Sequence, residues 1–232
     1  MLFQTQNMKN LFKEMAKIEA SVNDSKVAMG IICGNFGRGK TTILSHYASI
    51  KPQAKYLRAM DYWDARTMSS DICKELALPT NIKHSERVEE IILYLKYNHT
   101  ILIIDEMNKK VDSRPILETL RDIHDRADNT PIILAGTEEL WTKAKRDGSL
   151  WDRFRIKMKF LPFSADDIAL FAQNHPAIEI TKECAELIAK QTTSLRPMMN
   201  LLESIESKCL ANNIKTVDVN TFRSLNFRED DE

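Results

Sequence analysis

Eight consecutive residues have the types and spacing of a loop that binds phosphate. Gly34 and Gly39 enclose four residues and precede Lys40 and Thr41, which matches G-x-x-x-x-G-K-[ST]. Such glycines let backbone N–H groups face phosphate oxygens, while the lysine reaches the β- and γ-phosphates and the hydroxyl binds Mg²⁺. The residues expected around an ATP molecule with Mg²⁺ are Gly34, Asn35, Phe36, Gly37, Arg38, Gly39, Lys40, Thr41 and Thr42.

Two further segments carry polar residues directly after apolar runs. The segment ILIIDE ends in Asp105 and Glu106. Asp105 is expected to hold Mg²⁺, and Glu106 is expected to act as the general base on the attacking water. The segment IILAGT ends in Thr137, which we expect to hydrogen-bond the γ-phosphate or the water. The alternative is that Gly136 and Thr137 form only a turn.

Strands alternating with helices must position these residues. Apolar runs predict buried strands at 27–33, 101–106 and 131–135, and further strands are predicted at 54–59 and, from the alternation of its residues, at 155–160. Helices are predicted at 8–20, 41–49, 68–76, 85–97 and 115–127, the fourth with Ser85 as its N-cap. This alternation indicates an α/β fold with a parallel sheet covered on both faces.

The pattern changes after Pro162, where only helices are expected, at 165–173, 182–191 and 197–211. We therefore predict an N-terminal helical segment (1–26), an α/β core (27–162), a helical lid (163–222) and an acidic tail (223–232).

Composition excludes several other classes of protein. Lys plus Arg and Asp plus Glu are both 33, so a nucleic-acid surface must be a local patch. The four cysteines form no C-x-x-C pair, which argues against zinc and fits a reduced, cytoplasmic protein. The five histidines lack metal-like spacing, and no signal peptide or membrane span is expected.

The order of these motifs resembles the AAA+ ATPases. The stretches IIDEMNKK, ILETLRDIHD, TPIILAGTEELW and LWDRFR look most like the branch containing the phage Mu B transposition protein and the TnsC and TniB transposon regulators. The resemblance covers residues 27–212. It implies a ring or helical filament on double-stranded DNA, formed with ATP, that recruits a transposase and disassembles on hydrolysis.

The resemblance also implies roles for two arginines. Arg153 stands where the family carries the arginine finger that enters a neighbouring subunit's site, with Arg155 as the second choice. Arg196 stands where the family carries an arginine that contacts the nucleotide from the lid, and Pro197 fits the first turn of a helix there. The alternative for each is an ordinary surface arginine.

DNA would be held by basic side chains that contact phosphates and carry little sequence specificity. The candidates are Arg66, Lys109, Lys110, Arg114, Lys143, Lys145 and Arg146, and the alternative for each is a solvated charged residue. The function expected is an ATP-dependent regulator of transposition. A helicase loader or replication initiator is the first alternative, and a DNA-independent signalling or defence switch is the second.

Overall fold

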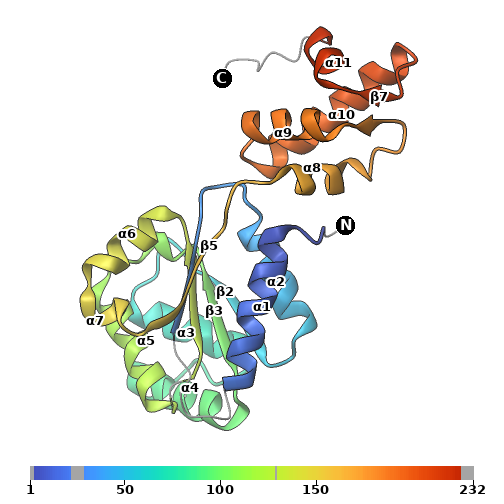
Figure 1. Ribbon diagram of the computed structural model, residues 1–232. Helices are drawn as coiled ribbons and strands as arrows, with labels where there is room; N and C mark the ends of the chain where they lie inside the picture. The colour runs from blue at the N-terminus through green and yellow to red at the C-terminus, as the bar shows by residue number, and fades with distance from the viewer. Residues whose placement is uncertain (1–2, 22–28, 129, 226–232) are drawn as a thin grey trace. The chain divides into compact units, whose positions relative to one another are not determined.

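A computed structural model describes residues 3–21, 29–128 and 130–225 (Figure 1). The polar break predicted at 21–26, the start of the first predicted strand and the end of the acidic tail lie almost entirely outside the described residues. The chain divides into two compact units. The core unit comprises 11–35 and 40–160, and the C-terminal unit comprises 1–10, 36–39 and 161–232.

The core unit is built on a five-stranded parallel sheet, which confirms the predicted α/β fold. Its strand order is β2-β3-β4-β1-β5. The strands are β1 (Met29–Cys33), β2 (Ala54–Arg58), β3 (Ile101–Asp105), β4 (Ile132–Gly136) and β5 (Phe154–Lys159). The third predicted strand included Glu106, but it ends one residue earlier because Glu106 has a left-handed backbone (φ 59°).

The predicted helices of the core are present with small shifts at their ends. They are α1 (Gln6–Ser21), α2 (Lys40–Ile50), α3 (Ala65–Glu75), α4 (His84–Asn98) and α5 (Arg114–Arg126). The prediction that Ser85 caps α4 was wrong, because Lys83 is the N-cap. Its backbone N–H donates to Glu86 Oε2 at 3.1 Å, so Glu86 at the third helical position satisfies the end of the helix.

Three short elements of the core were not predicted: the 3₁₀ helix η2 (Met107–Lys109), α6 (Glu138–Arg146) and α7 (Gly148–Trp151). The helix α6 follows β4 directly, with Thr137 as its N-cap. Its N-terminal turn is acidic and its C-terminal turn is basic, which suits the dipole of a helix.

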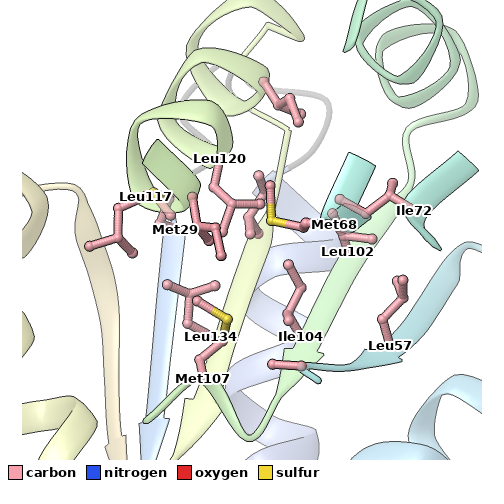
Figure 2. Packing of buried hydrophobic residues seen from close by; sticks show 14 of the residues in the cluster. Met29, Leu57, Met68, Ile72, Leu102, Ile104, Met107, Leu117, Leu120 and Leu134 are labelled. Carbon is pink, nitrogen blue, oxygen red and sulfur yellow. The ribbon is translucent and has the colours of Figure 1, made fainter. Parts of the chain in front are cut away.

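One face of the sheet packs against α3, α4 and α5. Figure 2 shows Leu117 and Leu120 of α5 pointing at Met29 of β1 and Leu134 of β4. Leu120 is fully buried, so truncating it to alanine would cost about 2–5 kcal/mol. The strands β1, β3 and β4 are buried at every position, as both faces of a parallel sheet require. The helices α1 and α2 lie on the other side of the sheet (Figure 1).

The C-terminal unit has its own apolar core, which includes Phe171, Ile188 and Leu202. Its helices are α8 (Ala165–Ala172), α9 (Lys182–Gln191), α10 (Leu195–Ala211) and α11 (Val219–Ser224). The expectation of helices alone was incomplete, because β6 (Glu179–Ile180) pairs with β7 (Thr216–Val217). Strands of two residues are too short to show the alternation by which a strand is recognised in a sequence.

Candidate functional site

The phosphate-binding loop follows β1 at the carboxyl edge of the sheet. Gly34 passes so close to the end of β5 that a Cβ there would lie 2.8 Å from Phe160 Cβ. Gly37 and Gly39 have φ angles of 74° and 81°, which other residues rarely adopt. The three glycines are therefore required by the course of the loop, and α2 begins directly behind it at Lys40.

The Lys40 side chain is buried and already turned into the loop. Its Nζ donates to Gly34 O at 2.7 Å and to Asn35 O at 3.0 Å. Backbone carbonyls are neutral acceptors, whereas phosphate oxygens are charged and bind an ammonium group more strongly. The loop thus holds its cation in place for a phosphate, and Thr41 and Thr42 follow at the exposed start of α2.

Asp105 is the centre of the polar contacts between α2, β2 and β3. It is 1% exposed, and its Oδ2 accepts hydrogen bonds from Thr41 Oγ1 at 2.6 Å and from Tyr56 OH at 2.9 Å. Burial and the nearby Asp105 carboxylate raise the pKa of Tyr56, so the phenol stays a donor. A carboxylate beside a hydroxyl is the oxygen-rich donor set that Mg²⁺ prefers. Thr41 and Asp105 therefore fit a magnesium site.

Glu106 has the unusual backbone of this site. Its left-handed φ of 59° is uncommon for a residue with a side chain, and such strain is concentrated at functional sites. Arg58 at the end of β2 lies 3.7 Å from Glu106 Oε1. The general-base candidate is thus next to the metal ligand and is held by a partly exposed arginine.

Thr137 lies at the end of β4, between the strands that carry the loop and Asp105. Its backbone N–H donates to Asn108 Oδ1 at 3.3 Å, whereas its hydroxyl does not cap α6. A Cβ on Gly136 would lie 2.8 Å from Asn108 Oδ1, so a side chain there would displace the Asn108 amide. The Thr137 hydroxyl is therefore available to a ligand at the same edge of the sheet as Asp105.

Arg153 lies at the opposite edge of the sheet. The parallel register pairs Met29 with Phe154, so Arg153 is next to the start of β1, whereas the loop follows its end. The four steps from Met29 to Cys33 span about 13 Å. Arg153 Nη2 binds Asp125 Oδ2 at 3.0 Å, and this contact lowers the pKa of Asp125. Arg153 is therefore placed away from the loop of its own chain, and Arg155 is exposed on β5.

Arg196 lies in the C-terminal unit, which also contains residues 36–39 of the loop. In that unit Leu195 N donates to Gly37 O at 2.8 Å, and Ser194 Oγ donates to Phe36 O at 3.3 Å. A Cβ on Gly37 would lie 2.6 Å from Ser194 Cβ. The exposed Arg196 thus directly follows Leu195, whose backbone N–H is hydrogen-bonded to the loop.

The cations predicted to bind DNA fall into two groups. Four of them have acceptors within the chain: Lys109 and Lys110 at Asp61, Arg114 at Glu118, and Lys143 at Asp112 and Glu139. The other three, Arg66, Lys145 and Arg146, are exposed and form no ion pair with another described residue. The structure therefore does not gather the seven candidates into one free patch.

The sequence did not single out Tyr56, Arg58 and Asn108, although each contacts a candidate site residue. Tyr56 lies in the middle of β2 and Arg58 at its end, and the sequence does not show that β2 lies beside β3 in the sheet. Polar residues at the end of a predicted strand were the available signal.

Cys33, the last residue of β1, is buried, and burial raises the pKa of its thiol to about 12.

Comparisons with known proteins place the chain in a family. The family model described as "AAA domain" matches residues 23–143, and a search of curated proteins found no match. The ORC2 protein of Aeropyrum pernix in ADPNP–ADP complexes has a TM-score of 0.66 at 14% identity, over 97% of this chain and 72% of that chain.

Two other similar structures concern DNA and replication in their own descriptions. The Aeropyrum pernix ORC1 protein in complex with DNA has a TM-score of 0.58 at 17% identity, over 97% of this chain and 65% of that one. Domain III of the Thermotoga maritima replication initiation protein DnaA has a TM-score of 0.54 at 18% identity, over 94% and 90% of the two chains. At these identities the likeness shows the fold alone.

Proposed function

The chain belongs to the AAA domain family, and from this premise we propose that it is an ATPase that assembles on duplex DNA in the manner of a replication initiator. One observation supports the assembly of several copies of the chain. The loop and Asp105 lie at one edge of the sheet, whereas Arg153 lies next to the other. An arginine so placed supports a site that is completed by a neighbouring copy of the chain.

The residues of the carboxyl edge, together with Arg153, have these roles in the proposal. Lys40 and the loop backbone bind the β- and γ-phosphates, and Thr41 with Asp105 holds Mg²⁺, which neutralises charge on the phosphate oxygens. Glu106 orients the attacking water and accepts its proton, while Thr137 hydrogen-bonds the water or the γ-phosphate. Arg153 of one copy stabilises the charge that develops in the site of the next.

The replication-initiator proposal is supported by the structural likeness to ORC1, ORC2 and DnaA domain III. The resemblance of the segments around Asp105, Thr137 and Arg153 to transposition regulators favours a second candidate. Both proposals share ATP, DNA and self-assembly, and they differ in the client protein. The client is a replicative helicase or its loading partner in the first and a transposase in the second.

The test of the shared proposal is assembly. The chain is mixed with ATP or ADP, with and without duplex DNA, and its mass is followed by sedimentation. We expect large complexes with ATP and DNA together and dispersal when ATP is hydrolysed. A single mass under all conditions would contradict assembly. Assembly to the same extent with and without DNA would favour a switch that acts without DNA. Binding assays against a replicative helicase and a transposase then separate the two clients.

No helix in the described part of the chain is long and apolar enough to cross a membrane.

A further inference from the structure

The face formed by α6, α7 and β5 has an unusual charge for this chain. The whole sequence has a formal net charge of zero. Across the three elements, positions 138–159, however, seven lysine or arginine residues accompany four acidic residues, a net charge of +3. They are Lys143, Lys145, Arg146, Arg153, Arg155, Lys157 and Lys159, with Glu138, Glu139, Asp147 and Asp152. These three elements follow one another along the chain and lie together in the core unit (Figure 1).

Two tryptophans join these elements into one surface. Trp141 of α6 and Trp151 of α7 pack edge to face with ring centroids 5.0 Å apart. Lys157 Nζ lies 4.3 Å from the centre of Trp151, and Lys159 Nζ lies 4.7 Å from the centre of Trp141. Lys145 is four residues after Trp141 and so lies on the same side of α6. Lys145, Lys157 and Lys159 therefore belong to one continuous basic face.

Several cations of this face have no acidic partner. Lys143, Arg153 and Lys159 pair with carboxylates of the chain. Lys145, Arg146, Arg155 and Lys157 are exposed, and no described carboxylate lies within ion-pair distance of them. This distinguishes them from Lys109, Lys110 and Arg114, whose acceptors are already within the chain. An uncompensated positive patch on a neutral chain is the electrostatic footprint of a polyanion site.

Resting on the proposed function, we propose that this α6–α7–β5 face binds the phosphate backbone of duplex DNA through Lys145 and Lys157, with Trp141 and Trp151 as the platform that positions the lysines. Proteins that bind single strands stack unpaired bases on open aromatic rings. Here a lysine lies over each tryptophan ring and both rings are partly buried. The covered rings favour contact with phosphates over stacking on bases, and hence the duplex.

The helix α6 also connects this face with the nucleotide site. It begins directly after Thr137, beside Asn108 and the end of β4, and its last turn carries Lys145 and Arg146. DNA held at the end of α6 is thus one short helix away from the γ-phosphate contact proposed for Thr137.

The experiment compares two double variants with equal changes in charge. Lys145→Glu with Lys157→Glu alters the face, and Lys13→Glu with Lys182→Glu alters exposed lysines of α1 and α9 as the matched control. The affinity for a labelled duplex is measured by fluorescence anisotropy over a series of salt concentrations with a non-hydrolysable ATP analogue. Arg155 is left intact because it is the second choice for the finger.

Loss of two phosphate contacts should lower the slope of log affinity against log salt by about two units, whereas the control keeps the wild-type slope. The double variant Lys145→Gln with Lys157→Gln also loses two positive charges and should show a similar loss of slope. It serves as the test if the double glutamate variant misfolds. If the wild type binds DNA and the double variants keep its salt slope, this inference alone is overturned. A wild type that binds no duplex would overturn the inference and the proposed function together.

A second copy of the chain is the competing occupant of this face. If the glutamate variant keeps the wild-type salt slope but no longer assembles with ATP in the absence of DNA, the face belongs to a contact between copies and the DNA proposal is wrong. If assembly without DNA is unchanged and the slope falls, the face belongs to DNA.

Discussion

The carboxyl and amino edges of the five-stranded sheet hold charged side chains in different ways. At the carboxyl edge Asp105 is 1% exposed and accepts from both Thr41 and Tyr56. At the amino edge Arg153 and Asp125 form one pair, with side chains 32% and 46% exposed. A buried network is costly to disturb, whereas an exposed ion pair contributes about 0–1 kcal/mol. Arg153 can therefore leave Asp125 at little cost, while Asp105 stays fixed.

Lys40→Ala should give the largest effect at the carboxyl edge. It removes the ammonium group that hydrogen-bonds the Gly34 and Asn35 carbonyls and that we assign to the β- and γ-phosphates. We expect ATP binding to be lost in a direct titration with a labelled nucleotide. An affinity close to that of the wild type would contradict the role of the loop.

Arg153→Ala tests the amino edge and should separate it from the carboxyl edge. ATP binding should be retained, while turnover should fall by roughly 10³–10⁵, the effect of removing an arginine finger. Wild-type activity per subunit should also rise with protein concentration.

Mixing provides the control for this variant. A Lys40→Ala subunit keeps its arginine, so it should restore part of the activity when added to Arg153→Ala. If mixing restores no activity and wild-type activity per subunit does not depend on concentration, Arg153 does not act in the site of a neighbouring copy.

Glu106→Gln should bind ATP and hydrolyse it about 10²–10⁴ times more slowly, because the amide keeps the shape of the side chain but cannot accept the proton. The variant should also remain assembled for longer after ATP is added, as measured by sedimentation. Turnover equal to that of the wild type would exclude Glu106 as the base.

Tyr56→Phe should have a smaller effect, limited to the carboxyl edge. It removes one donor to the buried Asp105 carboxylate, and a hydrogen bond to a charged group contributes about 1.5–3 kcal/mol to stability. Urea unfolding should report a loss of about this size. Phe12→Leu, at a ring contact of Tyr47 on the other face of the sheet, is a control that leaves Asp105 untouched. An unchanged unfolding free energy for Tyr56→Phe would show that the phenol does not support Asp105.

Asp125→Asn should give the smallest effect and one that depends on pH. Arg153 holds the pKa of Asp125 below its usual value, so the pair stabilises the fold at a pH above the unfolded-state pKa of Asp125. The variant should lose at most about 1 kcal/mol at neutral pH. The difference should vanish as the pH falls through the lowered folded-state pKa, and a constant difference in thermal unfolding would contradict this.

The location of the candidate site could be predicted where it depends on neighbours along the chain. The loop and Thr137 directly follow buried apolar strands and Asp105 ends one, and parallel strands bring such ends to one edge. Tyr56 and Arg58 could not, because their role depends on β2 lying beside β3, forty-seven positions away in the register that pairs Tyr56 with Ile103. Lys157 was missed for a similar reason, since its proposed role in DNA binding depends on its contact with the Trp151 ring.

The separation of the two edges has a consequence for the ends of an assembly. A contact in which the arginine edge of one subunit meets the loop edge of the next joins two different surfaces, which gives a closed ring or an open filament. An open filament has a polarity, and at one of its ends the ATP site faces no arginine. Under the proposed mechanism, that terminal subunit would keep its ATP while the interior hydrolyses. Short filaments would then turn over less ATP per subunit than long ones, and the assembly would lose subunits unequally from its two ends.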